Sequence, residues 1–170
     1  MRRIMILGQP GAGKSWLARE IGARTGLPVV HMDHIHWQSG WVERPIAEKL
    51  RLARAVEAGE AWIFEGGLSA TYASRAARAD LILWLDPPFA LRVWRVIRRN
   101  LLWWGRNRPD LPEGCCEDPR NLPGFLQFIW RSRHSAARRI AAVRPPPGVP
   151  LLRLRSRREV AAFLQGLPGK

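Results

Sequence analysis

Short apolar runs alternate with amphipathic segments along the 170-residue chain, and this alternation predicts the fold. The apolar runs, each expected to form a strand, cover residues 3–7, 29–32, 61–64, 81–85 and 151–154. Helical patterns follow them, at residues 15–25, 45–58, 88–104, 125–143 and 157–167. Continuous apolar strands separated by helices are typical of a parallel sheet covered on both faces. We therefore predict an α/β fold of three layers, α-β-α, around a five-stranded parallel sheet.

A glycine-rich loop follows the first apolar run. Its residues, Gly8-Gln9-Pro10-Gly11-Ala12-Gly13-Lys14-Ser15, match the pattern G-x-x-x-x-G-K-[ST] in full. The glycines let backbone N–H groups surround an anion, and the next helix adds its positive N-terminal end. In such loops the lysine reaches the β- and γ-phosphates, and the hydroxyl holds Mg²⁺. The sequence therefore predicts a site for ATP and Mg²⁺, with phosphate contacts from Gly8, Gly11, Ala12, Gly13, Lys14 and Ser15.

Composition leaves the class of partner open. The net charge is +14, and it is carried almost entirely by arginine, since the chain has three lysines. A basic surface attracts nucleic acid, but these arginines are spread along the chain and form no basic tail. Arginine also suits bidentate contact with phosphate oxygens, which a phosphotransferase needs as much as a DNA-binding protein does.

The chain is expected to be one cytoplasmic domain. No apolar run approaches the roughly 20 residues that a membrane helix needs. The two cysteines, Cys115 and Cys116, are adjacent and offer no disulfide framework, which fits a reducing compartment. Residues 105–123 are rich in proline, glycine and charge without periodicity, and we predict that they form a lid inserted into this domain.

Candidate acceptor residues follow the second and third predicted strands. Asp33 lies just past the second strand, and ligands of parallel sheets gather beyond the carboxyl ends of the strands. The alternative for Asp33 is a helix cap or a loop carboxylate. Gly66 and Gly67 end the third strand, where bare backbone lets an acceptor approach closely or simply makes a turn. These residues are our candidate substrate contacts.

The tryptophans are numerous for a chain of this length, nine in all. Trp16 stands where many phosphate loops carry a small hydroxyl residue, and we expect it to pack under the loop or near the nucleotide base. Trp37 and Trp41 follow Asp33, where one of them is placed to stack on a ring of the acceptor. Packing in the core is the competing role for both.

Charged residues after the fourth strand suit the transfer step. Asp86 ends that strand, where phosphoryl-transfer sites place a carboxylate that organises Mg²⁺ through water, or it caps the next helix. Arg106 and Arg108 lie in the predicted lid. Arginines there neutralise charge in the transition state while the lid excludes water, and solubility or nucleic-acid binding is the alternative.

Two groups of possible metal ligands are incomplete. His31, His34 and His36 flank Asp33, but no cysteine or second acid cluster completes a transition-metal set. We therefore interpret these histidines as loop residues near a substrate. A zinc-binding lid needs four ligands at wider spacing than the adjacent cysteines provide, so we expect no zinc there.

The order of these segments resembles the nucleoside-monophosphate-kinase and shikimate-kinase branch of P-loop proteins. More narrowly, nearly the whole chain resembles the adenylate-kinase-like bacterial proteins called DNA topology modulation proteins. The segments that carry the resemblance are Gly8–Ser15, residues 27–33 with Trp37, Glu65–Gly67, Trp84–Pro88, Arg106–Asp110, Glu113–Cys115 and Leu154–Glu159.

This resemblance implies a sheet order of 2-3-1-4-5 and a closing lid. It makes Asp33 a contact to the acceptor hydroxyl or its catalytic base, and it places the loop at Ser156 and Arg157 against the adenine. One departure is His31, where shikimate-kinase-like proteins often carry a second aspartate.

The predicted function is MgATP-dependent phosphoryl transfer to a small molecule, either a nucleoside monophosphate or a small hydroxyl metabolite. Lys14, Asp33, Arg106 and Arg108 are the predicted catalytic residues. The alternatives are a nucleotide-binding regulatory protein associated with DNA and a slow NTPase without an acceptor. The hypothesis of a DNA-associated protein rests on the charge and on the name of the similar family, and no helix-turn-helix or zinc motif supports it.

Overall fold

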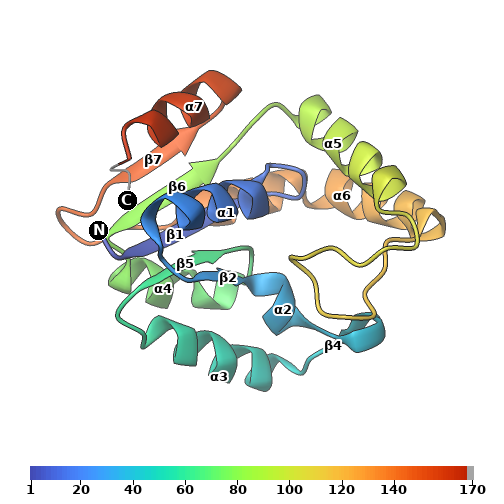
Figure 1. Cartoon of the computed structure of the whole chain (residues 1–170), viewed down its shortest axis with the longest axis horizontal. Coiled ribbons are helices and arrows are strands. Elements are labelled where there is room, and N and C mark those ends of the chain that lie inside the picture. Colours follow the sequence, from blue (N-terminus) through green and yellow to red (C-terminus); the bar gives the residue numbers. More distant parts are fainter. Residues whose placement is uncertain (168–170) are drawn as a thin grey trace.

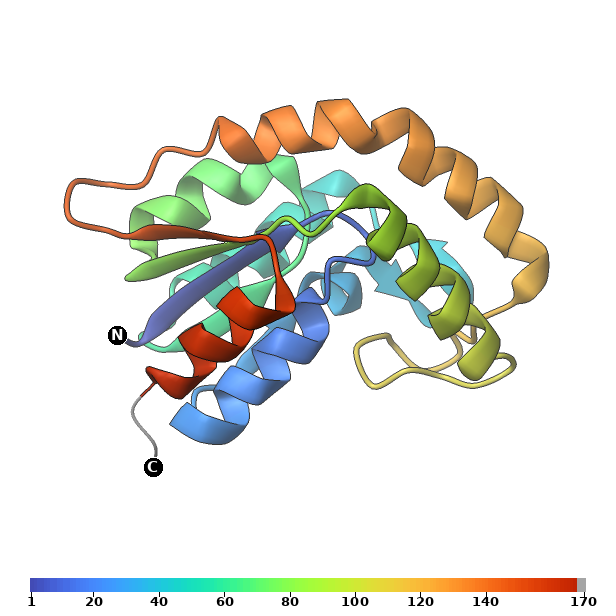
Figure 2. The same cartoon turned by 90° about the horizontal axis from the view of Figure 1, so that it is seen from above.

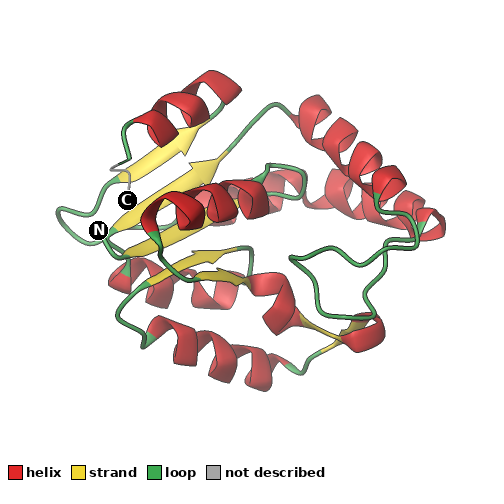
Figure 3. Ribbon diagram, in the orientation of Figure 1, coloured by secondary structure: helices red, strands yellow, loops and turns green. Residues whose placement is uncertain are grey.

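The computed structural model describes residues 1–167 and places a parallel sheet at the centre of the molecule (Figures 1 and 3). Within these residues the strands of this sheet are β1 (Arg3–Gly8), β2 (Val29–His31), β5 (Trp62–Glu65), β6 (Leu81–Leu85) and β7 (Leu151–Leu154). Their spatial order is β2-β5-β1-β6-β7, and each pair of neighbours is parallel. In sequence order this is 2-3-1-4-5, so the predicted fold class is confirmed.

Helices cover both faces of the sheet (Figure 2). One face packs against α1 (Lys14–Thr25) and α7 (Arg157–Gln165). The opposite face packs against α2 (Met32–His36), α3 (Ile46–Glu57), α4 (Tyr72–Arg78) and the end of α6 (Leu122–Ala141). The arrangement gives the three predicted layers.

Alternation along β1 divides its side chains between two cores. Ile4 and Ile6 belong to the cluster beneath α1 and α7, whereas Met5 and Leu7 belong to the cluster on the other face. All four are fully buried. Burial of such a side chain contributes roughly 1.5–3 kcal/mol, so a strand apolar at every position fits the centre of a covered sheet.

The structure differs from the predicted elements beyond the second strand. Met32, predicted to end that strand, instead begins α2, where its buried side chain packs at the end of the sheet. The next residues form a short antiparallel hairpin, β3 (Trp37–Gln38) and β4 (Val42–Glu43), joined by the turn η1 (Ser39–Trp41). Two-residue strands are too short to leave a periodic signal, so the hairpin was not predicted.

Two long helices project beyond the carboxyl edge of the sheet (Figures 1 and 2). They are α5 (Phe89–Leu102) and the first part of α6. Residues 103–121 connect them, and we call this segment the insertion loop; it ends in the turn η3 (Pro119–Asn121). The loop begins and ends two residues earlier than the predicted lid, because α5 ends at Leu102 and Leu122 and Pro123 already belong to α6. The loop lies opposite α2 and the hairpin.

Among residues 1–167, no helix combines the length and apolar character needed to cross a membrane.

Candidate functional site

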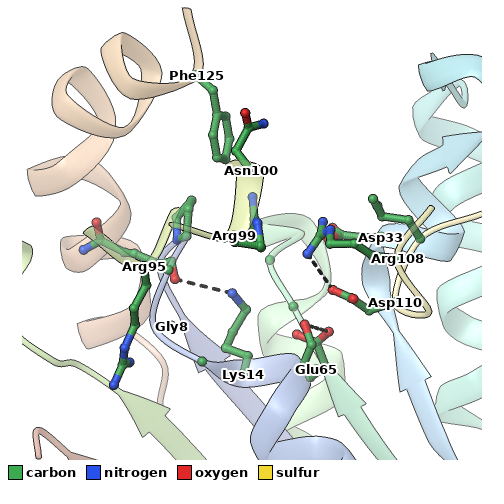
Figure 4. A pocket seen from close by; sticks show the side chains of 18 of the residues that line it. Gly8, Lys14, Asp33, Glu65, Arg95, Arg99, Asn100, Arg108, Asp110 and Phe125 are labelled. Atoms are coloured by element: carbon green, nitrogen blue, oxygen red, sulfur yellow. Dashed lines mark hydrogen bonds and ion pairs between the residues drawn. The ribbon is translucent and has the colours of Figure 1, made fainter. Parts of the chain in front are cut away.

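A cavity of about 950 Å³ opens at the carboxyl ends of β1 and β5. Its floor is the phosphate loop (residues 8–15), and its other walls come from α2, the hairpin, α5, the insertion loop and α6. Figure 4 shows Lys14 pointing up toward Arg99, with Asp33, Arg108 and Asp110 on one side and Arg95 on the other. Segments distant in sequence therefore meet in one hollow.

The phosphate loop is held in shape by its own backbone and by α5. The N–H of Ala12 donates to the carbonyl of Gln9 at 3.1 Å. Gly11 has a φ of +76°, and a Cβ at this position would lie 2.3 Å from the carbonyl oxygen of Arg92. A side chain is excluded on both counts, since this backbone region and this contact favour glycine.

Gln9, a variable position of the motif, links the loop to both projecting helices. Its Nε2 donates to the carbonyl of Arg133 at 3.0 Å, and its Oε1 accepts from Nη1 of Arg92 at 2.8 Å. Arg95 donates from Nη1 to the carbonyl of Ala12 at 3.0 Å. The position of the phosphate loop is thus coupled to α5 and α6.

Lys14 and Trp16 both line the cavity. Nζ of Lys14 donates to the carbonyl of Gln9 at 3.4 Å, so the ammonium lies over the centre of the loop. The indole of Trp16 is half exposed at the cavity mouth instead of being packed beneath the loop. Of the two expected positions for Trp16, the structure has the one on the ligand side.

Glu65 is the carboxylate next to the phosphate loop. Its Oε1 accepts from the Ser15 hydroxyl at 2.9 Å and lies 2.7 Å from Nδ1 of His31. Burial acts to raise the pKa of Glu65, but the hydrogen bond from His31 and the charge of Lys14 outweigh it and lower that pKa. The group is therefore ionised at neutral pH. Side-by-side hydroxyl and carboxylate oxygens are the hard donors that Mg²⁺ prefers, so Ser15 and Glu65 fit this cation.

No role for Glu65 beside Ser15 was predicted from the sequence. The available signal was its place as the last residue of a strand next to β1 in a parallel sheet. Glu65 is aligned with Ile6, two residues before the phosphate loop begins. Parallel neighbours end at one edge of the sheet, which brings their last residues together.

Asp33 lies in the first turn of α2 and faces the cavity. Burial raises the pKa of Asp33 above its usual value, and the neighbouring charge of Glu65 raises it further. Lys14 and Arg108 act in the opposite direction. A carboxylate with a raised pKa accepts a proton more readily than an ordinary aspartate, which suits a general base.

Gly66 and Gly67 line the same wall as Asp33. Gly66 has a φ of +113°, and a Cβ there would lie 2.5 Å from Cβ of Met32. Arg75 supports this turn from behind, because its Nη2 donates to the carbonyl of Gly66 at 2.9 Å. Burial lowers the pKa of Arg75 to about 10, and its guanidinium stacks on the ring of Phe64 at 4.7 Å. Arg75 thus positions the turn.

Arg108 is buried and held by two acidic residues of its own loop. Its Nη1 lies 3.0 Å from Oδ2 of Asp110, and its Nε lies 2.9 Å from Oε1 of Glu117. Glu117 also pairs with Nε of Arg99 at 3.2 Å and accepts from the Asn100 amide at 2.9 Å. One buried carboxylate therefore fixes two arginines that line the cavity.

Asp110 brings the insertion loop to the phosphate loop. Burial acts to raise the pKa of Asp110, but the nearby charge of Arg108 acts against it and the pKa is lowered overall. Arg19 of α1 approaches its Oδ1 at 3.9 Å. The insertion loop therefore approaches α1 next to the phosphate loop.

The insertion loop also contacts the acceptor side. The indole N–H of Trp41 donates to the carbonyl of Cys116 at 3.0 Å, and Sγ of Cys115 donates to the carbonyl of Gln38 at 3.2 Å. Nε2 of His34 lies 3.3 Å from the carbonyl oxygen of Pro109. These contacts join the loop to the segment that carries Asp33.

Trp37 and Trp41 both line the cavity, with ring centroids 5.4 Å apart in an edge-to-face arrangement. His36 packs against Trp37 at 4.6 Å. Burial lowers the pKa of His36, and the charge of Lys49 lowers it further. These aromatic rings form a surface in the cavity wall on which a planar ring can stack.

Ala12, whose carbonyl accepts from Arg95, is not part of the cavity lining, and three further predicted site residues are also absent from it. Asp86 forms an ion pair with Arg153 of the edge strand β7, so the carboxylate beside Ser15 is Glu65 and not Asp86. Arg106 is exposed, because the insertion loop turns Arg108 inward in its place. Arg157 is also exposed. The predicted roles of these three residues gain no support from their positions.

The described residues 1–167 contain no group of three or more histidine, cysteine, aspartate or glutamate side chains arranged to hold a metal ion. The histidines near Asp33 instead contact protein groups.

Comparisons with known proteins identify the fold of this chain but not its family. No protein-family model matches the chain, and no curated protein matches it. Among solved structures it is similar to shikimate kinase from Acinetobacter baumannii in complex with shikimate, with a TM-score of 0.60 and 17% identity over 97% of this chain and 89% of that one. Shikimate kinase from Bacteroides thetaiotaomicron gives a TM-score of 0.52 at 16% identity, over 96% and 94% of the two chains. A sugar kinase from a Janibacter species gives 0.51 at 16%, over 97% and 93%.

Proposed function

We propose that this protein transfers the γ-phosphoryl group of MgATP to a hydroxyl group of an acceptor bound next to Asp33. The observation that carries the proposal is that Lys14, Asp33 and Arg108, from three separate segments, line one cavity. A phosphate-binding lysine, a carboxylate of raised pKa and a buried arginine are the parts that phosphoryl transfer to a hydroxyl needs. The solved structures of similar fold, which are named as shikimate and sugar kinases, agree with it.

Asp33 distinguishes between the two acceptor classes expected from the sequence. A hydroxyl acceptor loses its proton during transfer, and Asp33 is placed to receive it. A phosphate acceptor carries its own negative charge, which a second carboxylate at the same place would repel. We therefore favour a small hydroxyl compound over a nucleoside monophosphate.

The chain's own residues supply positioning and charge. Backbone N–H groups of the phosphate loop and the positive end of α1 hold the donor phosphates. Lys14, Arg99 and Arg108 neutralise the charge that spreads over the transferred group. Mg²⁺, when held at Ser15 and Glu65, supplies further charge neutralisation on the phosphate oxygens.

The insertion loop acts as a lid in this proposal. Its contacts with both the phosphate loop and the hairpin exclude water from the transferred group, which otherwise competes with the acceptor. We place the nucleotide base at Trp16 and Arg95 and treat residues 1–170 as one kinase-like domain. Membership of the narrower topology-modulation family also remains part of the proposal.

The test is transfer of label from γ-labelled ATP to a panel of nucleosides, nucleoside monophosphates and small hydroxyl metabolites. We expect a labelled hydroxyl product that Lys14→Ala abolishes. Asp33→Asn is expected to lower kcat by about 10²–10⁴-fold while the Kd for ATP stays nearly unchanged. Hydrolysis without any labelled acceptor would make the protein a slow NTPase, and full transferase activity in Asp33→Asn would remove the base role.

A further inference from the structure

The positive charge of the molecule is concentrated on the two projecting helices. Helices α5 and α6, which we call the arginine arm, contain eight arginines and no lysine, aspartate or glutamate. All 14 acidic residues of the chain lie elsewhere. These two helices therefore have a net charge of +8, which leaves +6 for the rest of the chain.

Aromatic side chains are exposed on the same helices. Trp94 of α5 is 52% exposed, and Phe128 and Trp130 of α6 are each 55% exposed. Arginines lie over two of these rings: the guanidinium of Arg98 is 5.8 Å from the ring of Trp94, and that of Arg133 is 3.6 Å from the ring of Trp130. Large exposed aromatics among cations indicate a surface for an anionic, ring-bearing ligand.

The arm is continuous with the candidate site. Trp94, Arg98 and Phe128 line the same cavity as Lys14 and Asp33. Figure 2 shows α5 and α6 extending together from the phosphate loop past the edge of the sheet. A ligand that follows these helices outward therefore has one end at the place where phosphoryl transfer is proposed.

We infer that the arginine arm binds a single-stranded nucleic acid and that the acceptor is the hydroxyl group on the terminal nucleoside of that strand. The second part of this inference, the identity of the acceptor, rests on the proposed function. Arginines suit the backbone phosphates, and exposed aromatics suit unstacked bases, which single strands offer and duplexes do not. Trp37 and Trp41 are placed to stack on the terminal base at the acceptor end.

The chemical step balances without a further reactant. The terminal hydroxyl oxygen forms a bond to the γ-phosphorus of ATP, and the bond from that phosphorus to the β–γ bridging oxygen breaks. The hydroxyl proton passes to Asp33, and ADP leaves with the electron pair of the broken bond. The products are a strand with a phosphorylated end and ADP.

An anionic membrane is a weaker match for this surface. Membrane-binding helices separate an apolar face from a basic face, so that the apolar face enters the lipid. On the arginine arm aromatic and basic residues are instead neighbours: Arg98 lies one turn after Trp94, and Arg131 directly follows Trp130. Such mixing suits alternating phosphates and bases better.

The binding experiment uses fluorescence anisotropy of a 12-nucleotide single strand with a free 5′ hydroxyl and a dye at its 3′ end, without ATP. The test variant is Arg131→Gln with Arg138→Gln, two exposed arginines of α6. The matched control is Arg51→Gln with Arg54→Gln, two exposed arginines of α3. We expect roughly tenfold weaker binding and a salt slope lower by about 1.4 in the test variant. The control variant should bind like wild type.

Three binding results would overturn the inference: no measurable binding, equal losses in both variants, or binding to anionic vesicles without binding to the strand. Duplex DNA bound as tightly as the single strand would also contradict it. Trp94→Ala extends the test to stacking, with a loss of roughly 1–3 kcal/mol per base expected, which is about 5- to 150-fold in Kd.

The transfer experiment compares the same strand with a free nucleoside as acceptors of labelled phosphate. We expect a higher kcat/KM for the strand, and the α6 variant should remove that advantage while the α3 variant keeps it. Equal rates for the strand and the nucleoside would overturn the strand acceptor but leave the proposed function standing. Strand binding with no transfer to any acceptor would instead overturn the proposed function.

Discussion

The phosphate loop and the opposite wall of the cavity are constructed in different ways. The loop is a run of eight consecutive residues whose shape depends on glycines and on the start of α1. The opposite wall is assembled from Asp33 of α2, Arg99 of α5 and Arg108 with Glu117 of the insertion loop. A local motif binds phosphate in many proteins, whereas under the proposed function the assembled wall determines which acceptor is used.

Charge is also handled differently in the two regions. The phosphate loop presents backbone donors and Lys14, with Glu65 next to Ser15. The opposite wall pairs each of its inward arginines with a buried carboxylate. Variants on the loop should therefore affect donor binding and transfer together, and variants on the wall should affect mainly the transfer step.

Lys14→Ala should have the largest effect. Removal of the ammonium over the phosphate loop is expected to lower kcat/KM for transfer by about 10³–10⁵-fold, by analogy with other cations that stabilise the transferred group. Steady-state kinetics measure the loss, and a thermal melt close to that of wild type shows that folding is kept. A larger loss from any variant on the opposite wall would reverse the ranking of the two regions.

Arg108→Gln should have a smaller effect than Lys14→Ala, and Arg106, the other arginine predicted in the lid, provides the control. Arg108 is buried in the cavity wall and Arg106 is exposed, although both were predicted to be catalytic. We expect Arg108→Gln to lower kcat by about 10²–10³-fold with a small change in the Kd for ATP. Arg106→Gln should change kcat less than twofold. Equal effects would show that the loop rearranges to bring Arg106 inward.

Glu117→Gln should have an intermediate effect, because Glu117 acts through the arginines that it holds. We expect kcat to fall roughly tenfold, as for loss of a supporting group, while KM for ATP changes little. Asp118→Asn, an adjacent carboxylate paired with the exposed Arg120, is the control. A purely structural role would instead lower the melting temperature without separating kcat from KM.

Asp33→Asn should raise stability while it removes activity. The folded-state pKa of Asp33 is raised, so its ionisation costs stability: the cost is absent below the unfolded pKa, grows as the pH rises from there to the folded pKa, and is complete above it. We expect the melting temperature of Asp33→Asn to exceed that of wild type by roughly 2–4 °C at neutral pH, as for a gain on the order of 1 kcal/mol. The difference should shrink as the pH falls. A lower melting temperature at pH 7 would contradict the assignment.

The pH profile of transfer gives the same information in wild type. If Asp33 must be ionised, kcat/KM should fall as the pH drops through a pKa above that of an ordinary aspartate. Glu65→Gln removes a charge that raises this pKa, so the acid limb should move to lower pH. If Glu65→Gln leaves the acid limb unchanged, that limb reports the titration of a group other than Asp33.

Much of the fold could be predicted from local patterns in the sequence. Leu81–Leu85 and Leu151–Leu154 are strands at the predicted bounds, and the predicted sheet order is confirmed. Apolar runs and glycine or proline boundaries are local signals, so they can be recognised without knowing which segments pack against each other. The hairpin at Trp37–Glu43 and the short helix α2 lacked such a signal, and both were missed.

The residues of the candidate site also fall into two groups, those that local sequence predicts and those that it does not. The sequence by itself determined the phosphate loop, because its backbone shape depends on residues that are adjacent in the chain. The tertiary structure alone decided that Glu65, and not Asp86, lies at Ser15, and that Arg108 turns inward while Arg106 stays in solvent. It also decided that α5 and α6 lie together and concentrate the arginines on one arm. These choices depend on strand order, burial and ion pairing between distant segments, which no local pattern encodes.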